Sequence, residues 1–176
     1  MNVGKRLKQL RDDNKRTQQQ MAFDFNVSRE SFSAYETERA KLPADIAQQL
    51  TNEFNDPFVA LEAVAEYYGW GIGKLDGQAV DLHRASVKAK TEEELEEALE
   101  AIKKVCLSNN PSFMEAHQRD ELKRALMEAI DAIVALKHFV AVICKEYGFS
   151  WIKLWAEHKV KLIARKYKKA DRKNVA

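Results

Sequence analysis

Between residues 28 and 41 the chain gathers hydroxyls, guanidinium groups, carboxylates and an ammonium group within a short stretch. A guanidinium such as that of Arg29 can donate two parallel hydrogen bonds to guanine, and a carboxylate such as that of Glu30 can accept one from cytosine. Nearby hydroxyls and cations can bind phosphate oxygens whatever the base sequence. We therefore predict contacts with double-stranded DNA. The side chains of these types in this stretch include those of Ser28, Arg29, Glu30, Ser33, Arg39 and Lys41.

A tight corner in the sequence positions these side chains. It lies in TQQQMAFDFNVSRESFSAYETE, residues 17–38. Thr17 and Gln20 fit a capping box that begins one helix, and Ser28 is a good cap for the next. Asn26 tolerates the left-handed backbone that so short a turn needs. The pattern predicts two short helices that cross at a steep angle.

The second of these helices, expected over residues 28–36, has two distinct faces. Phe32 and Tyr35 fit an inner face, which leaves Arg29 and Glu30 outside near its N-terminal end. A helix held in this way can enter the major groove with its first residues at the base edges. Exposed residues that contact nothing would give the same pattern, so the sequence leaves both interpretations open. Glu36 fits a structural role as a hydrogen-bond or salt-bridge partner within the domain.

Apolar stripes predict three more helices around this corner. Val3, Leu7 and Leu10 form one stripe near the start of the chain. A second helix is expected to begin at Pro43, and a break at Asn55-Asp56-Pro57 separates it from a third over residues 58–68. The N-terminal part of the chain is therefore expected to be a unit of five helices.

This part of the chain resembles the Cro-type, or XRE-type, DNA-binding domain of phage repressors over about residues 3 to 58. The matching positions are Thr17-Gln18, Ala22, Val27-Ser28 and Tyr35-Glu36. The resemblance implies a lambda-repressor-like fold of five helices and a helix-turn-helix. Carried over by position, it also implies the DNA-binding residues, which are Gln18, Ser28, Arg29, Glu30, Ser33, Arg39 and Lys41, with Arg6 and Arg11 as further candidates for phosphates. Two positions depart from the family pattern. Asn26 stands at the usual turn glycine, and Thr37-Glu38 stands at the usual Asn-Gly, so a different loop after the second helix is expected.

Charge is distributed unevenly along the 176 residues, although the net charge is only +2. Residues 1–41 hold nine basic and six acidic side chains, residues 92–100 hold six glutamates and no base, and residues 153–173 hold nine basic and two acidic side chains. The basic ends fit a polyanion, and a solvated tail is the alternative for the C-terminal one. We find no signal peptide and no uninterrupted apolar span, which predicts a cytoplasmic protein without a membrane partner.

The C-terminal part is also expected to be helical, which makes the chain all-α. The expected divisions are a DNA-binding domain over 1–68, a glycine-containing connector over 69–90 and a helical oligomerisation domain with a basic tail over 91–176. Capping boxes predict that helices begin at Thr91, with Glu94, and at Ser112, with Glu115. Gly148 should end the second of these, and Ser150 should cap a last helix.

Two apolar faces on the long helix before Gly148 suggest a bundle shared between subunits. Leu126, Ile130, Ile133 and Val140 are expected to pack inside their own subunit, whereas Val134, Phe139 and Val142 face elsewhere. Leu95, Leu99, Ile102 and Cys106 should line one face of the preceding helix. We expect a homodimer or homotetramer through residues 91–167. A bundle within one chain is the alternative.

No motif predicts catalysis, a metal or another cofactor. The four histidines and two cysteines are scattered without ligand spacing, and no nucleophile or phosphate-loop pattern occurs. The favoured interpretation is a sequence-specific transcriptional regulator, a repressor of a prophage or conjugative element that binds operators, with a protein anti-repressor as a further partner. The alternative is an antitoxin or anti-repressor-like protein whose helical C-terminal domain binds a protein partner.

Overall fold

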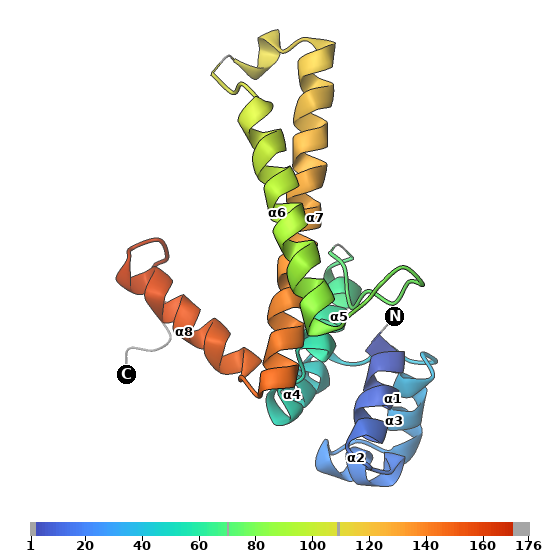
Figure 1. Cartoon of the computed structure of the whole chain (residues 1–176). Helices are drawn as coiled ribbons and strands as arrows, with labels where there is room; N and C mark the ends of the chain where they lie inside the picture. The colour runs from blue at the N-terminus through green and yellow to red at the C-terminus, as the bar shows by residue number, and fades with distance from the viewer. Residues whose placement is uncertain (1–2, 70, 109, 171–176) are drawn as a thin grey trace. The chain divides into compact units, whose positions relative to one another are not determined.

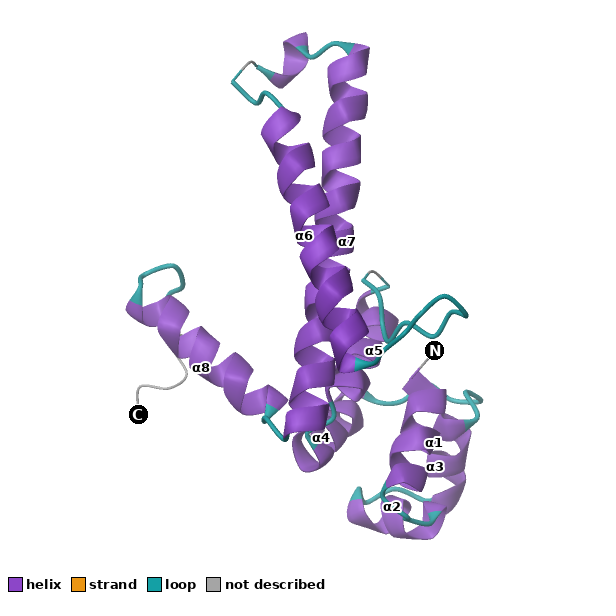
Figure 2. Ribbon diagram, viewed as in Figure 1, coloured by secondary structure: helices purple, strands orange, loops and turns teal. Residues whose placement is uncertain are grey.

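Every regular element in the computed structural model is helical, across the residues that it describes: 3–69, 71–108 and 110–170 (Figures 1 and 2). The chain divides into two compact units. One holds the N-terminal helices together with the last helix, and the other runs from Asp76 to Glu146.

Five helices open the first unit, as the sequence predicts. They are α1 (Val3–Asp13), α2 (Gln18–Asp24), α3 (Arg29–Glu36), α4 (Ala44–Phe54) and α5 (Pro57–Tyr68). The predicted capping box of α2 is present, because Thr17 Oγ1 accepts from Gln20 N at 3.2 Å and Gln20 Oε1 accepts from Thr17 N at 2.8 Å. Asn26 takes the left-handed conformation with φ 52°, which turns the chain within four residues.

The turn between α4 and α5 is also bonded to α1. Asn55 ends α4 in the left-handed conformation with φ 48°. Asp56 then caps α5, since its Oδ1 accepts from Phe58 N at 2.9 Å and Val59 N at 3.0 Å. The same carboxylate pairs with the buried guanidinium of Arg6 in α1. One aspartate therefore fixes the start of α5 against α1.

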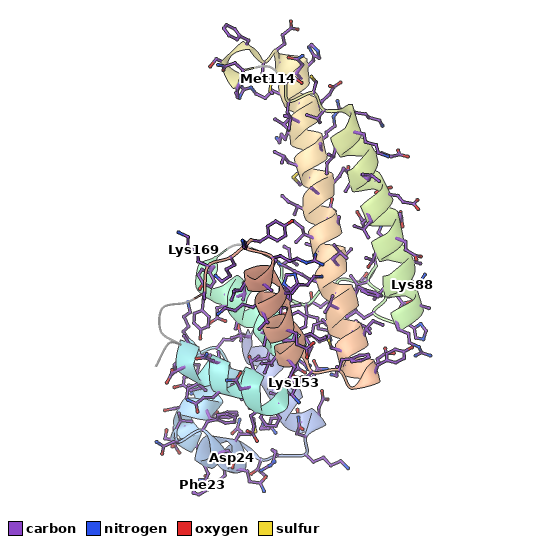
Figure 3. All side chains as sticks on the ribbon, turned by 90° about the vertical axis from the view of Figure 1, so that its left-hand side faces the viewer. Phe23, Asp24, Lys88, Met114, Lys153 and Lys169 are labelled. Carbon is purple, nitrogen blue, oxygen red and sulfur yellow. The ribbon has the colours of Figure 1, made fainter. Side chains whose placement is uncertain are left out.

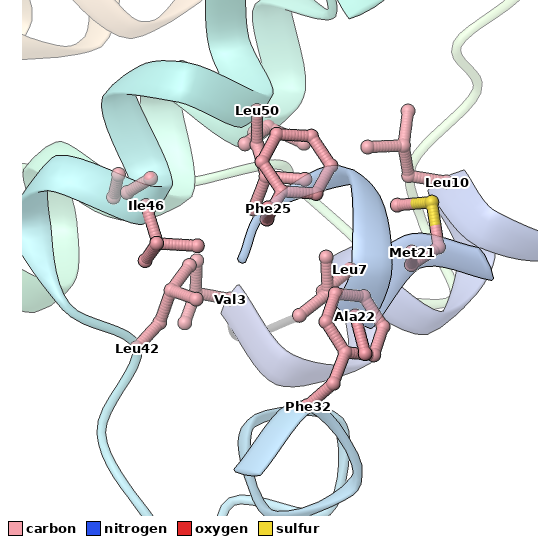
Figure 4. Close-up of a cluster of buried hydrophobic side chains, with 13 residues drawn as sticks. Val3, Leu7, Leu10, Met21, Ala22, Phe25, Phe32, Leu42, Ile46 and Leu50 are labelled. Atoms are coloured by element: carbon pink, nitrogen blue, oxygen red, sulfur yellow. The ribbon is translucent and has the colours of Figure 1, made fainter. Parts of the chain in front are cut away.

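The core of this unit lies where α1 to α5 converge (Figure 4). Phe32, Met21 and Leu50 are each fully buried there. Their burial supplies the main stabilising free energy, roughly 2–3 kcal/mol for a side chain of this size. α3 is held from behind by this cluster, which leaves its other side to solvent.

The second unit is built on a helical hairpin. It contains α6 (Arg84–Lys104), a short 3-10 turn, η1 (Pro111–Phe113), and most of α7 (Ala116–Tyr147). The two long helices lie side by side in both views (Figures 1 and 3). They run antiparallel, because Arg84 pairs with Glu146 at 3.2 Å and Thr91 Oγ1 donates to Ala135 O at 3.3 Å.

The predicted starts of both hairpin helices are wrong. α6 begins seven residues before Thr91, with His83 as its cap. Thr91 is buried in the middle of α6, where its hydroxyl donates to Val87 O at 2.7 Å. A threonine followed by glutamates fits a capping box, but here the hydroxyl serves the helix interior instead. α7 begins after Glu115 rather than at Ser112, which lies within η1.

The predicted division of the apolar faces of α7 is wrong at four positions, while Val134, Phe139 and Val140 are all half-buried. Leu126, Ile130 and Ile133 were expected inside, yet they are 56%, 49% and 51% exposed. Val142 was expected elsewhere and is buried. Small side chains, including Ala98, Ala125 and Ala132, take the buried positions of the hairpin instead. Leu95, Leu99 and Ile102 of α6 are exposed as well.

The last helix, α8 (Trp151–Ala164), belongs to the first unit. Gly148, with φ 73°, follows α7, and Ser150 caps α8, as the sequence predicts. Asn55 ties this start to the end of α4, because its Oδ1 accepts from Ser150 Oγ at 3.1 Å and Ile152 N at 3.3 Å. Among the described helices, none has both the length and the apolar character needed to cross a bilayer.

Candidate DNA interface

The N-terminal end of α3 is exposed and carries the side chains predicted to read bases. Ser28 caps the helix: its Oγ accepts from Ser31 N at 3.0 Å and donates to Ser31 Oγ at 2.9 Å. Arg29 and Glu30 follow in the first turn, and both are exposed. Phe32, one residue after Ser31, is fully buried, so the core fixes the direction in which this first turn points.

Close backbone contact holds α3 against α1. A Cβ atom built on Gly4 would lie 2.6 Å from Tyr35 O and 2.8 Å from Glu38 Cγ. Only glycine fits at this distance, because real Cβ atoms do not approach a backbone oxygen so closely. Sequence reasoning missed Gly4. The available signal was an isolated glycine within an otherwise helical apolar stripe, which often marks a close approach.

Glu36 joins the first three helices at one buried carboxylate. Arg11 Nε donates to its Oε1 at 2.5 Å, and Gln18 Nε2 donates to its Oε2 at 2.7 Å. Glu36 is only 5% exposed, which confirms the structural role expected for it. The hydrogen bond with Glu36 is the main cause that raises the pKa of the Arg11 guanidinium.

Gln18 is therefore held in place by the protein itself. It is the first residue of α2 and is half-buried. Its amide nitrogen is occupied by Glu36, while a side-chain amide also offers an oxygen and a second N–H. These groups suit a phosphate or a base, so the predicted contact of Gln18 with DNA stays a prediction.

Arg39 folds back over the outer side of α3. Its Nε donates to Thr37 Oγ1 at 3.0 Å and its Nη2 donates to Ser33 Oγ at 3.4 Å. These bonds bring two predicted contacts, Arg39 and Ser33, to one place. Glu38 takes φ 60°, which is the left-handed conformation that a glycine of the family pattern would adopt. The loop can therefore keep that turn although its residue types differ.

Lys41 lies beside α5 rather than beside α3. Its Nζ is 4.9 Å from the centroid of the Tyr67 ring and 3.5 Å from Glu66 O. The side chain remains exposed. The structure does not bring Lys41 to the first turn of α3, and a contact with a neighbouring phosphate is the role that its charge suits.

Arg6 cannot serve as a phosphate contact. Its side chain is fully buried, pairs with Asp56 and lies 5.8 Å from the centroid of the Phe58 ring. Arg11 is mostly buried as well and is engaged by Glu36. In sequence, an arginine on the first helix of such a unit looks like a surface cation. Whether Arg6 is buried or lies at the surface depends on its partner Asp56, which is 50 residues away in the sequence.

One acidic cluster in the described part of the chain has the composition of a metal site. Glu94, Glu128 and Asp131 bring carboxylate oxygens within 4.8 Å of one another. Glu94 is already paired with Lys90 at 2.9 Å. The cluster lies in the hairpin, in a different unit from α3, and nothing in its geometry points to catalysis.

Comparison with known proteins agrees with this geometry. Residues 4–68 match the family described as a helix-turn-helix domain. Over 137 residues, the chain is 29% identical to an immunity repressor protein of Bacillus phage phi105, which covers 76% of this chain and 85% of that protein. No solved structure matches the chain.

Proposed function

Because residues 4–68 match a helix-turn-helix domain and resemble the Cro/XRE phage-repressor type, we propose that the chain reads specific operators in double-stranded DNA and represses transcription by occupying them. The observation that carries this proposal is the exposed first turn of α3, with Arg29 and Glu30 outside and Phe32 buried behind them. The name of the phage phi105 relative, an immunity repressor, favours repression over activation.

Base recognition is assigned to the first turn of α3. Arg29 suits guanine and Glu30 suits cytosine. Gln18 at the start of α2 and Ser33 on α3 would contact a phosphate or a base, and Arg39 after α3 and Lys41 beside α5 would contact phosphates. Ser28 contributes as the cap that sets the helix end, and its hydroxyl is already engaged by Ser31. Phosphate contacts supply affinity and register, while base contacts supply specificity.

We propose further that two or four copies assemble through residues 91–167. A single helix-turn-helix reads only one half-site, and dimers read two half-sites about 34 Å apart. The hairpin favours this assembly, because Leu126, Ile130 and Ile133 form an exposed stripe at helical spacing along α7. Large exposed apolar patches mark sites of protein association. A four-helix bundle made from two hairpins would bury such a stripe.

The same exposed stripe also favours a second candidate function. An antitoxin or anti-repressor-like protein would use the hairpin to bind a different protein, and DNA binding would be secondary. The two functions predict different complexes. A chain purified from its natural host with a second polypeptide in stoichiometric amount supports this candidate, whereas an assembly of this chain alone supports the repressor.

Selection from random DNA tests the main proposal. The full chain would be incubated with a random duplex library at two salt concentrations, and bound sequences would be determined. We expect a palindromic motif with half-sites about one helical turn apart, and we expect weaker binding at the higher salt concentration because cations that neutralise phosphates release counterions. Recovery of no preferred sequence would contradict operator recognition. A single half-site would contradict assembly on the operator.

A further inference from the structure

The outer side of α6 combines an apolar stripe with a row of carboxylates. Leu95, Leu99 and Ile102 are 41%, 52% and 54% exposed, and their spacing places them on one stripe. Glu92 and Glu96 lie three residues before Leu95 and Leu99, so they border the stripe along one edge. Among the described residues, none buries any of these three side chains.

α8 has the complementary pattern. Residues 151–170 hold seven basic side chains and one acidic one. Trp151 is the buried residue of the helix, and Trp155 and Leu154 beside it are 52% and 39% exposed. The Trp155 ring lies 5.5 Å from the Trp151 ring and 6.1 Å from the His158 ring, measured between centroids, so the aromatic groups form a row along the helix.

Two cations continue this aromatic row toward the C-terminal end of α8. Lys161 lies three residues after His158, and Arg165 lies four residues after Lys161. Both are exposed. Among the described residues, no ion pair engages either of them, and none engages Glu96, whereas Glu92 pairs with the exposed Lys88 at 2.5 Å. In Figure 3 Lys153, in the first turn of α8, and Lys169, beyond its end, mark the extent of this basic segment.

We propose that α8 of one copy docks along α6 of a second copy. The Trp155 side of α8 would cover Leu95, Leu99 and Ile102, and Lys161 and Arg165 would face Glu92 and Glu96. The proposal deepens the proposed assembly of two copies and rests on it for the identity of the partner. In a twofold dimer the exchange is reciprocal, so two identical contacts form.

The two halves of the contact have different physical roles. The exposed aromatic and aliphatic side chains supply affinity, because burying them removes apolar surface from water. The charges supply selectivity, since a basic helix is repelled from any other basic surface and attracted to the one stretch that has six glutamates and no base. The hydrogen bonds from Asn55 hold the first turn of α8 in place. This lowers the conformational entropy that is lost when the rest of the helix docks.

Charge reversal with compensation between copies tests the contact. One full-length variant carries Lys161→Glu and Arg165→Glu, and another carries Glu92→Lys and Glu96→Lys. A third carries all four changes. The control carries Glu93→Lys and Glu97→Lys, which is the same charge change placed about 100° further around α6 and away from the stripe. Self-association would be measured by sedimentation, with circular dichroism as the check on folding.

Each two-residue variant should self-associate at least about tenfold more weakly than the unmodified chain, because both contacts of its dimer become repulsive. An equimolar mixture of the two should recover association, since both contacts of the mixed dimer pair opposite charges. The four-residue variant should self-associate without a second variant present. The control variant should self-associate like the unmodified chain.

Three results would overturn the proposal. Unchanged association of the two-residue variants shows that the charges do not meet. Recovery in the four-residue variant without recovery in the mixture shows that α8 docks on its own chain. Unchanged association with weaker DNA binding and a flatter salt dependence in the Lys161/Arg165 variant assigns α8 to DNA instead. The self-association results do not depend on operator recognition, which the selection from random DNA tests separately.

Discussion

At the scale of single residues, base recognition by the exposed first turn of α3 is predicted to depend on Arg29. Because the side chain extends from the first turn, replacing Arg29 with alanine should remove base contacts without disturbing the core. We expect a loss of about 1–3 kcal/mol in binding to the selected operator and a relaxed preference at one base pair. Titration of labelled duplexes that differ at each position measures both.

An arginine far from the interface provides the control for this variant. Arg119 is exposed in α7, and replacing it with alanine makes the same change in charge and size. The Arg119 variant should bind like the unmodified chain. If Arg29→Ala kept both the affinity and the base preference, the assignment of α3 as the reading helix would be wrong.

Glu36 shows how a buried residue can serve the interface without touching DNA. Replacing Glu36 with glutamine keeps the size but removes the charge that Arg11 and Gln18 contact at 2.5 Å and 2.7 Å. We expect the unfolding free energy to fall by roughly 2–4 kcal/mol, because the mostly buried Arg11 would lose its buried counter-charge and keep only the exposed carboxylate of Asp12, 2.7 Å away. Chemical denaturation measures this loss. Glu30→Gln, at an exposed position, should change stability by less than about 0.5 kcal/mol, and an equal effect of both variants would contradict the role of Glu36.

At the scale of elements, the attachment of α8 depends on Asn55. Asn55→Gly keeps the left-handed backbone at the end of α4 and removes the side chain that bonds Ser150 and Ile152. Amide hydrogens at the start of α8 should then exchange faster, because two of the bonds that fix this turn are gone. Mass spectrometry of exchanged peptides resolves the effect. Peptides from α1 to α3 serve as the internal reference, and an unchanged α8 would show that other contacts hold it.

At the scale of the whole molecule, assembly is predicted to depend on the apolar stripe of α7. Ile130 is 49% exposed in the single chain, so its replacement with aspartate should leave the fold intact. It should weaken self-association at least about tenfold, because a charge would be buried at the interface between copies. Light scattering across a concentration series measures the change. Lys123→Asp, at an exposed polar position of α7, should have no such effect, and a dimer that survives Ile130→Asp would place the interface elsewhere.

Local signals in the sequence determined much of the first unit. The capping box at Thr17, the turn residue Asn26 and the cap Ser28 each act within a few residues, so their types and spacing suffice to predict α2 and α3. The family resemblance of the same residues predicted the helix-turn-helix that the comparisons find. The exposed positions of Arg29 and Glu30 also followed, because Phe32 sets the helix face.

Only the tertiary structure decided which residues are paired across the chain and which apolar faces are covered. Arg6 is buried because Asp56 lies against it, and Thr91 lies within a helix because its side chain packs against α7. Leu126 and Ile130 are exposed because alanines fill the hairpin interior. Periodicity identifies an apolar stripe, but a helix with two such stripes does not reveal which one its own chain covers, since that depends on contacts between residues far apart in sequence.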